Sequence, residues 1–491
     1  MSRPARTPLF SVPLDRQGSD PLFLQISRAI IADVQGGRIR PGTRLPGTRT
    51  LADTLKVHRN TVLAAYEELE SEGWVESTQA RGTYISRALP EVKPQAFARR
   101  VALRDAVPTS AGFELGAEPP PVEVTTWPVG TLVMSGGVPD VRLTPVLALA
   151  RAYRQALRRN TRSVLSYSDS LGYQRLRAAL ATMLTTTRGL APSEDDVLVT
   201  RGSQMALDLI GRTLIRSGDV IAVEALGYRP AWEAFRRYGA KLLPVPVDRD
   251  GLDVDALAKA CEQNKVRAVY VTPHHQYPTM ATLTAGRRLA LLELARKQRF
   301  AIIEDDYDHE FHYEGRPVLP LASVDRAGVV IYVGTLAKIL APGLRLGYVV
   351  APRALLERLA ANRFYVDRQG DYAVEAAVAK LIDDGEVQRH ARRARRIYHA
   401  RRDFLATALR RAFAQVLYFE TPPGGMAIWA KADAQVDVDG WCERAAKRGV
   451  VFSPARHFSF DTKPRQELRL GFAALDETEL ADAVKRLRAS L

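Results

Sequence analysis

Short apolar segments alternate with longer helix-like segments along most of this chain, from about residue 131 onward. The apolar segments are near-continuous runs of β-branched residues, at 197–200, 220–223, 268–271, 301–303 and 329–333. Strands that are apolar on both faces are typical of a parallel sheet with helices packed on each side. The sequence therefore predicts an α/β body over residues 131–491, built on a mostly parallel sheet.

The length of 491 residues exceeds one domain of ordinary size, so two or three domains are expected. No apolar stretch reaches membrane-spanning length, and the first residues lack the apolar core of a signal peptide. These features predict a cytoplasmic protein without a membrane partner. Cys261 and Cys442 suggest neither a disulfide framework nor a metal site.

Residues 21–86 show a different pattern, with three short helical periods followed by two strands. The first period begins at Pro21 and stops at Gly36, the second starts near Thr48, and the third covers about 58–72. Two short strand patterns follow, with a polar tip between them. Three helices and a hairpin predict a winged helix-turn-helix of the α+β class.

The segments on either side of this module lack regular periodicity. Residues 1–20 are interpreted as an N-terminal tail. Residues 87–130 are interrupted by prolines, including a run at 119–121, and carry balanced charge. Proline-rich segments act as semi-extended spacers, so residues 87–130 are predicted to be a linker.

Basic residues gather at one end of the 21–86 module. Between positions 38 and 59, five arginines and Lys56 face a single acid, Asp53, while acids gather from Glu67 onward. Together with a net charge of +15, this predicts a positive end turned toward phosphates. A denser run at 389–396, continuing to 401–402, indicates mainly the solvated or interface face of a long helix, with accessory DNA contact as the alternative.

The 21–86 segment resembles the GntR family of bacterial regulators. The resemblance lies in Leu45-Pro46, in the run Arg59-Asn60-Thr61-Val62, and in the wing Arg81-Gly82-Thr83. It implies that the third helix meets base edges of double-stranded operator DNA with its first residues, while arginines contact phosphates. The residues assigned to DNA are Arg44, Arg49, His58, Arg59, Asn60, Thr61, Arg81 and Gly82. His58 stands where the family usually has a serine or similar cap, which weakens the expected cap.

Lys338 and Arg345 lie close together in the chain, and the acidic pair Asp305-Asp306 follows an apolar strand pattern upstream. Chemistry on pyridoxal 5'-phosphate (PLP) needs such a set: an amine, an acid that keeps the ring nitrogen protonated, and cations for the phosphate. Another strand passes through Gly202 into a helix whose first N–H groups would cradle an anion. Each feature alone is weak, and their combination indicates a cofactor site.

Residues 131–491 resemble the fold-type I PLP enzymes of the aspartate aminotransferase group, and the whole chain resembles the MocR subfamily of GntR regulators. The resemblance implies a transferase body with a smaller C-terminal α+β subdomain, about 375–491. It assigns Lys338 as the Schiff-base lysine and Arg469 as the receptor of an amino acid's carboxylate. The residues it assigns to the cofactor are Asp305, Tyr307, Tyr228, Ser203, Gln204, Thr335, Arg345, Tyr277 and His275. Only the resemblance separates Asp305 from Asp306, and a packed core tyrosine is the alternative for Tyr228.

Three positions depart from the family pattern. Ala337 stands where a serine usually precedes the lysine, Met280 replaces a glycine, and residues 424–427 lack a histidine common in relatives. The amine, ring acid and phosphate site remain, so PLP binding is expected, while turnover and effector identity stay open. The adjacent His274 and His275 have no Cys or carboxylate at ligand spacing, so no metal site is predicted.

The sequence thus favours a PLP-dependent transcriptional regulator that senses PLP, and an amino acid or amine, through an aminotransferase-like body. The alternative is an active aminotransferase with an autoregulatory DNA-binding head. A homodimer is implied by the resemblance to fold-type I enzymes, whose active sites lie at the subunit interface.

Overall fold

The protein is described by a computed structural model in which the chain divides into two compact units, Met1–Glu123 and Val124–Leu491. The residues that the structure describes are 12, 14–16, 20–78, 82–90, 110–115, 126–159, 161–315 and 318–491. Most of the expected tail and linker, and Arg81 of the wing, lie outside these residues. The first unit is called the head and the second the body.

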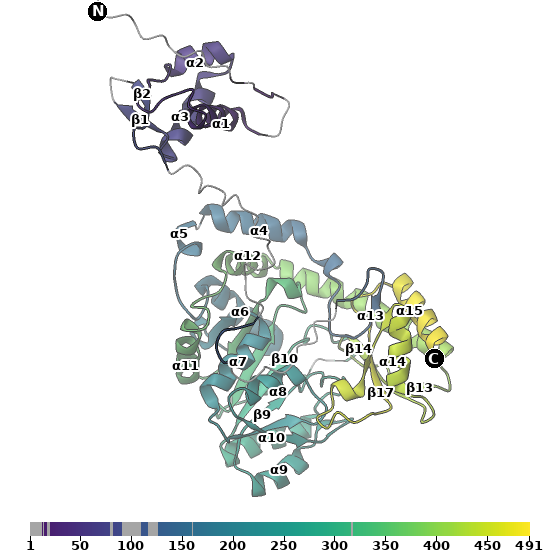
Figure 1. Cartoon of the computed structure of the whole chain (residues 1–491). Coiled ribbons are helices and arrows are strands. Elements are labelled where there is room, and N and C mark those ends of the chain that lie inside the picture. The colour runs from purple at the N-terminus through teal and green to yellow at the C-terminus, as the bar shows by residue number, and fades with distance from the viewer. Residues whose placement is uncertain are drawn as a thin grey trace, which may run out of the picture. The chain divides into compact units, whose positions relative to one another are not determined.

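The head is a winged helix-turn-helix, as the sequence predicted (Figure 1). Its elements are α1 (Leu22–Gln35), α2 (Thr48–Leu55), α3 (Arg59–Ser71), β1 (Val75–Thr78) and β2 (Gly82–Ile85). The two strands pair antiparallel, with Val75 opposite Ile85. One apolar cluster holds the helices to the hairpin, because Ile26 of α1, Val62 and Leu69 of α3, and Ile85 of β2 are all buried in it.

His58 caps α3, contrary to the expectation that the cap would be weak. Its backbone is extended, and its Nδ1 accepts a hydrogen bond from the N–H of Asn60 at 3.2 Å. An imidazole nitrogen therefore takes the place of the hydroxyl or carboxylate oxygen that usually satisfies a free N–H at a helix start. The start of the third helix is fixed by this contact.

The body is built on a seven-stranded sheet in the order β4-β12-β11-β10-β9-β5-β6. The strands are β4 (Val197–Thr200), β5 (Val220–Glu224), β6 (Lys241–Val245), β9 (Val266–Val271), β10 (Ala301–Asp306), β11 (Val330–Thr335) and β12 (Gly347–Val350). All neighbouring strands are parallel except β12, which runs antiparallel to both β11 and β4. The prediction of a mostly parallel sheet is confirmed.

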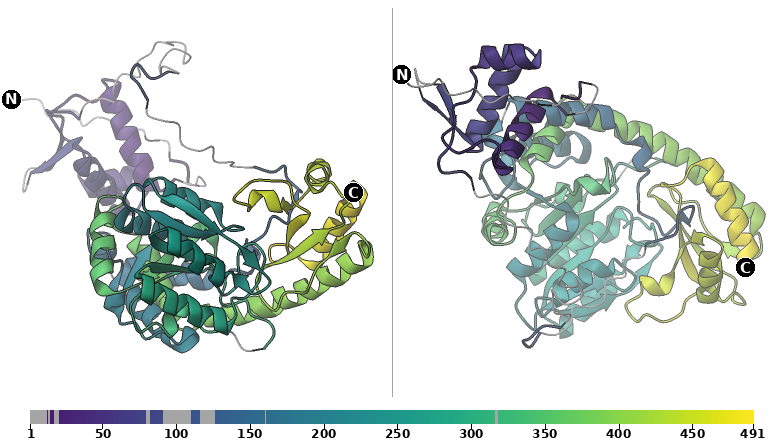
Figure 2. Two further views of the ribbon diagram at one scale, coloured as in Figure 1. Left: turned by 90° about the horizontal axis from the view of Figure 1, so that it is seen from below. Right: turned by 45° about the horizontal axis from the view of Figure 1, so that its top comes forward.

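Helices cover both faces of this sheet (Figure 2). In β4, Val197 and Val199 pack in one apolar cluster with α6 and α12, while Leu198 between them packs in another with α7, α8 and α11. The helices of this part are α4 (Val146–Arg159), α5 (Thr161–Val164), α6 (Gln174–Arg188), α7 (Gly202–Leu214), α8 (Arg229–Arg236), α9 (Val254–Gln263), α10 (Ala285–Gln298), α11 (Arg353–Phe364) and α12 (Tyr372–Asp383). Burial on both faces is the reason that these strands lack polar alternation.

A smaller α+β part follows the long helix α13 (Glu386–Ala412). Its sheet runs β13 (Leu417–Tyr418), β14 (Ala427–Ala432), β17 (Glu467–Gly471), β16 (Ser453–Pro454), and it carries α14 (Val438–Lys447) and α15 (Glu477–Ser490). The beginning of the body joins it, because β3 (Leu132–Val133) pairs with β15 (Val450–Val451) and Met134 lies in the same core. A short hairpin, β7 (Val247–Asp248) and β8 (Gly251–Leu252), completes the strands.

The basic run of the sequence lies on α13, and its two parts differ. Arg392, Arg393, Arg395 and Arg396 are exposed, whereas Arg401 and Arg402 are buried. Arg401 pairs with Asp140 at 2.9 Å and Arg402 with Glu314 at 2.7 Å. The solvated face expected for the whole run therefore does not include Arg401 and Arg402, which lie on the buried side of α13. Among the described residues, no helix combines the length and apolar character needed to cross a membrane.

Candidate functional site

The carboxyl ends of parallel strands β5, β9, β10 and β11 meet at a cavity of about 240 Å³. Ligand sites in such sheets lie beyond the carboxyl ends of the strands. Nine of the residues assigned to the cofactor or its covalent link line this cavity: Ser203, Gln204, Tyr228, Tyr277, Asp305, Tyr307, Thr335, Lys338 and Arg345. Segments far apart in the sequence are brought together by the strand order alone.

Lys338 lies just after β11, in the wall of the cavity. Burial, reinforced by the charge of Arg469, lowers the pKa of its amine below the usual value. A lowered pKa increases the share of neutral amine, the form that attacks a carbonyl. The polypeptide before it is held by two contacts: Leu336 N–H donates to the Leu346 carbonyl at 3.0 Å, and Ala337 N–H donates to Thr335 Oγ1 at 3.1 Å.

Asp305, near the end of β10, is buried with one oxygen satisfied and one not. Tyr270 donates its hydroxyl to Oδ2 at 2.8 Å, while Oδ1 has no hydrogen-bond partner among the described residues. Burial raises the pKa of Asp305 to about 7. A buried carboxyl with a free oxygen is stabilised by a cationic N–H, and a protonated ring nitrogen is such a group.

The other end of the cavity is formed by the start of α7 and by Arg345. Arg345 donates from Nη2 to the carbonyl of Arg201 at 3.1 Å, which holds its guanidinium beside the helix start. A side chain at Gly202 would press on this guanidinium at 3.0 Å, and one at Gly347 would lie 2.6 Å from the Gly202 carbonyl carbon. The two glycines therefore let an arginine and the N–H groups of a 13-residue helix converge, a combination suited to a phosphate.

Arg469, in β17, is fully buried beside the cavity. Its Cζ lies 4.7 Å from the centre of the Tyr277 ring, and none of its guanidinium nitrogens has a hydrogen-bond partner in the described part of the chain. A side chain at Gly136 would overlap Nη1, so the glycine leaves the guanidinium reachable. An unpaired buried cation is costly, and a carboxylate is the ligand that its planar fork fits.

His275 is the one residue assigned to the cofactor that does not line the cavity. Its Nδ1 lies 2.8 Å from Oδ1 of Asp308, and its ring turns toward His274 and His312 instead. His309 joins this group, with its ring stacked on that of His274 at 4.5 Å. Burial lowers the pKa of His274 well below the usual range and also lowers that of His312.

Sequence reasoning missed three groups at the cavity. Tyr270 reads as one more core residue of an apolar strand, and only the pairing of β9 with β10 brings its hydroxyl to Asp305. Gly136 and Gly137 line the cavity with positive φ angles of 91° and 75°, and the doublet in the sequence was the available signal.

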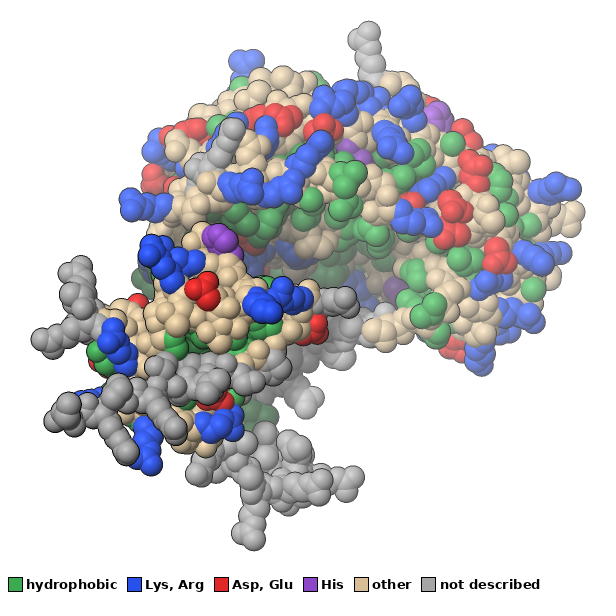
Figure 3. Space-filling model, turned by 90° about the horizontal axis from the view of Figure 1, so that it is seen from above, with side chains coloured by type: hydrophobic (Ala, Val, Ile, Leu, Met, Phe, Trp, Pro, Cys, Tyr) green, Lys and Arg blue, Asp and Glu red, His purple; other side chains and the backbone are tan. Residues whose placement is uncertain are grey.

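Of the described residues assigned to DNA, His58, Arg59, Asn60 and Thr61 lie at the start of α3, Arg49 lies on α2, and Arg44 lies beside Gly82 of the wing. Arg44, Arg49, His58, Arg59 and Asn60 are exposed and Thr61 is partly buried. The guanidinium of Arg44 lies against the wing, because a side chain at Gly82 would meet its Nε at 3.1 Å. On the face of the molecule shown in Figure 3, basic and acidic side chains mix over both units. On this face, the positive net charge of the chain is therefore not gathered in one basic patch.

Comparison with known proteins divides the chain in the same way. Residues 22–85 match the family described as bacterial regulatory proteins, gntR family, and residues 133–487 match aminotransferase class I and II. The probable rhizopine catabolism regulatory protein MocR of Rhizobium meliloti is 32% identical over 482 residues, 97% of this chain and 95% of that protein. This chain belongs to the MocR-type regulators.

The similarity to aminotransferases is confined to the body of this MocR-type chain. A 2-aminoadipate transaminase of Thermus thermophilus is 32% identical, over 74% of this chain and 90% of that protein. The crystal structure of LysN, an α-aminoadipate aminotransferase of the same organism complexed with N-(5'-phosphopyridoxyl)-L-leucine, superposes with a TM-score of 0.69 at 30% identity, covering 74% of this chain and 92% of that one.

The cofactor of the MocR-type body is pyridoxal 5'-phosphate, and the unsatisfied groups of the cavity fit it. Oδ1 of Asp305, the hydroxyl of Tyr307, Oε1 of Gln204 and the guanidinium of Arg469 are buried without hydrogen-bond partners among the described residues. A protonated ring nitrogen, a ring oxygen and the carboxylate of an amino acid are groups that would satisfy the acid, the phenol and the arginine. When bound, PLP would supply an aldehyde that can react with an amine and a ring that accepts electrons.

Proposed function

We propose that this MocR-type regulator binds operator DNA through the start of α3 and the wing, and that an amino acid or amine entering the PLP pocket changes that binding. The observation that carries the proposal is the buried guanidinium of Arg469, which has no hydrogen-bond partner among the described residues and lies beside the cavity lined by Lys338. Arg345 already offers a guanidinium for the phosphate of PLP. A site that held only PLP would not need a second guanidinium, that of Arg469, to bind a carboxylate. A cytoplasmic location follows from this role, because operator DNA lies there.

Each side chain of the pocket has a proposed task. Lys338 would hold the cofactor covalently, Asp305 would keep its ring nitrogen protonated, and Tyr307 would hydrogen-bond the ring oxygen. Thr335, Arg345 and the amides of Ser203 and Gln204 would bind the phosphate, while Tyr228 and Tyr277 would enclose the ring. Arg469 would orient the effector by its carboxylate.

The effector can alter DNA binding only through a difference in its affinity for two arrangements of the protein. A homodimer would present two heads to the two half-sites of an operator. The half-site spacing that the two heads can bind would then depend on how the bodies are arranged. We propose this dimer because fold-type I bodies, to which this one is similar, pair with their sites at the subunit interface.

The test is protection of promoter DNA by the purified full-length protein. Replacing Arg59 with Ala should weaken protection between about five- and about 150-fold, because one base contact contributes about 1–3 kcal/mol. The cofactor's colour should be unchanged. Arg28→Ala is the control, because Arg28 is an exposed head arginine whose partner is Asp20 at 2.6 Å. Equal protection by the wild type and Arg59→Ala would contradict the assignment of α3 to base edges.

An active aminotransferase is the second candidate, and a specific observation favours it. An aminotransferase also requires a lysine whose pKa is lowered, as that of Lys338 is, with an acid and an arginine at the same cavity, as Asp305 and Arg345 are. Sustained production of a keto acid from an excess of amino acid, with a second keto acid supplied to accept the amino group, would establish this activity. A single change of the cofactor's absorption, without turnover, would leave the sensor as the function of the pocket.

A further inference from the structure

Four histidines gather beyond the carboxyl ends of β9 and β10, and none of them lines the cofactor cavity. His274 and His275 follow β9, and His309 and His312 follow β10; together they are called the histidine cluster. The ring of His274 lies 4.4 Å from that of His275 and 6.0 Å from that of His312, measured between centroids. His274 and His275 lie far in the sequence from His309 and His312, so only the fold shows that the four rings lie together.

We propose that His274, His275 and His312 form a binding site for one transition-metal ion, with Zn²⁺ as the expected occupant. One ring nitrogen of each of the three lies within 4.8 Å of the others. Zinc–nitrogen bonds of about 2.0–2.1 Å in a tetrahedron place ligand atoms about 3.3 Å apart. The rings need to close by small rotations about χ2, which is a soft torsion for histidine.

His275 is oriented as a metal ligand usually is. Asp308 lies 2.8 Å from Nδ1, and Nε2 is buried with no hydrogen-bond partner among the described residues. Histidines that bind metals commonly donate their other N–H to a carboxylate, which fixes the ring and frees the second nitrogen. Space beside Nε2 is kept open by Gly424, where any added side chain would overlap this nitrogen.

His274 gives the second independent observation. It is 4% exposed, and neither of its ring nitrogens has a hydrogen-bond partner in the described part of the chain. Buried imidazole nitrogens are normally satisfied, and one nitrogen of His274 lies within 4.8 Å of a nitrogen of His275 and of His312, so a partner that accepts several ligands would satisfy it. A metal ion is such a partner.

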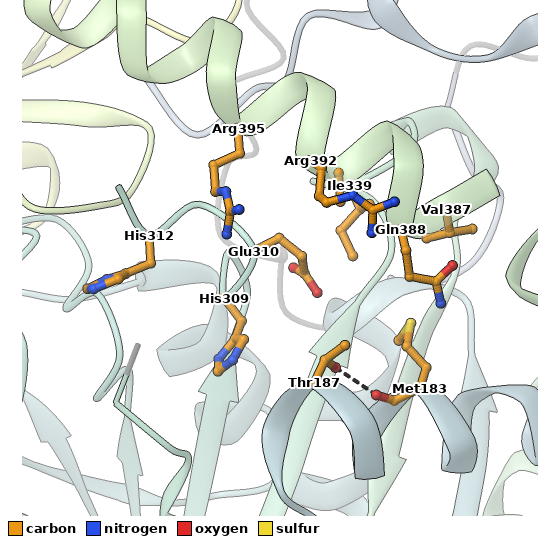
Figure 4. A pocket seen from close by; sticks show the side chains of 11 residues that line it. Met183, Thr187, His309, Glu310, His312, Ile339, Val387, Gln388, Arg392 and Arg395 are labelled. Carbon is orange, nitrogen blue, oxygen red and sulfur yellow. Dashed lines mark hydrogen bonds between the residues drawn. The ribbon is translucent and has the colours of Figure 1, made fainter. Parts of the chain in front are cut away.

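His312 completes the set from the solvent side. It lines a second cavity, of about 270 Å³, beneath α13 (Figure 4). The figure shows His309, Glu310 and Arg395 around the same space. A three-histidine site with an open position toward this cavity could be filled from solvent, with water or a small anion as the fourth ligand. Three imidazoles favour zinc, copper or nickel over magnesium or calcium, which prefer oxygen ligands.

A second set, His274, Asp306 and His309, has comparable spacing and is the weaker choice. Oδ2 of Asp306 already accepts from the Tyr332 hydroxyl at 2.5 Å, and Nε of Arg188 lies 3.6 Å away. The arginine compensates the carboxylate's charge and repels a cation. Asp306 is therefore already served by protein groups, His309 at 3.0 Å among them, whereas Nε2 of His275 and both ring nitrogens of His274 have no hydrogen-bond partner among the described residues.

The experiment uses full-length protein without a histidine tag, with its cofactor fixed by borohydride so that free PLP carries no metal. After treatment with a chelator, the protein is titrated with zinc chloride against a competing fluorescent chelator, and bound zinc is counted by mass spectrometry. One equivalent per chain is expected. His275→Gln and His312→Gln should each weaken binding at least about a hundredfold, the upper end of the loss measured for supporting partners of such ligands.

His399→Gln is the matched control, because His399 lies on α13 outside the histidine cluster, with Nε2 3.4 Å from Asp403. It should bind zinc as the wild type does. If either cluster variant does not fold, anomalous diffraction at the zinc edge from wild-type crystals decides. A peak among His274, His275 and His312 supports the site. A peak among His274, Asp306 and His309, a peak elsewhere, or zinc binding that no cluster variant weakens would overturn it.

Discussion

The head and the body place their candidate contact residues in opposite environments. In the head, Arg49, Arg59 and Asn60 are exposed, and the side chain of Arg59 has only a 3.4 Å contact to Thr48 Oγ1 among its described hydrogen bonds. In the body, Asp305 and Arg469 are buried, and each keeps an atom without a partner among the described residues. One unit presents solvated charges, and the other holds charges that solvent does not reach.

This difference follows from the ligands. DNA is a polyanion, and binding it releases counterions, so exposed arginines can bind it without a prepared cavity. A small cofactor gains affinity and tuned chemistry from groups removed from water, at the cost of unfavourable burial when the ligand is absent. The body should therefore respond to single substitutions and to pH much more strongly than the head.

The largest effect is expected at Lys338. Borohydride treatment should add the mass of the reduced cofactor to the wild-type chain and add nothing to Lys338→Ala, because no other amine lines the cavity among the described residues. Lys380→Ala is the control, since Lys380 lies on α12 and pairs with Asp384 at 2.8 Å. Mass spectrometry of digested protein measures the result. Labelled cofactor on another lysine of the Lys338→Ala chain would contradict the assignment.

A smaller effect is expected from the protonation of Asp305. Its pKa in the fold is about 7, above the ordinary value of 3.8, so the cofactor-free fold holds a proton that the unfolded chain releases. The stabilisation that the fold gains by keeping this proton on Asp305 is present below pH 4 and is lost as pH rises toward 7. Asp305→Asn should reduce the fall in unfolding free energy by up to about 1.4 kcal/mol per pH unit in this window.

Denaturant titrations of the cofactor-free full-length protein at a series of pH values measure this slope. Some slope should remain in the variant, because burial also raises the pKa of Glu304 and of Glu375 to about 7. Asp53→Asn, an exposed change in the head, should leave the slope as it is in the wild type. A variant of Asp305 with an unchanged slope would show that this carboxyl is not the protonated group.

The smallest effect is expected in the head. Replacing Arg49 with Ala should lower the slope of log affinity against log salt concentration by about 0.9, the contribution of one phosphate contact. Filter binding or fluorescence anisotropy over a range of salt concentrations measures it. Arg28→Ala should keep the wild-type slope, and a slope unchanged by Arg49→Ala would place that arginine away from the DNA backbone.

The sequence predicted the winged head and the parallel-sheet body because both rest on local periodicity. It also predicted nine residues that line the cofactor cavity, since motifs around Lys338 and Asp305 carry a resemblance. It missed Tyr270, whose hydroxyl reaches Asp305 only because β9 lies beside β10. It expected a weak cap at His58, because the ability of an imidazole to accept from Asn60 depends on a backbone angle that residue identity does not state.

By itself, the sequence determined the types of elements, the order of the two units and the chemical groups available, because apolar spacing and residue type act locally along the chain. Only the tertiary structure decided which groups meet. The fold places Asp305 and Lys338 at one cavity and buries Arg469 with no hydrogen-bond partner among the described residues. It also places His275 outside the cavity lining, beside His274 and His312. Desolvation and pairing are properties of positions in space, so the charge states and the metal site proposed here arise only when the chain folds.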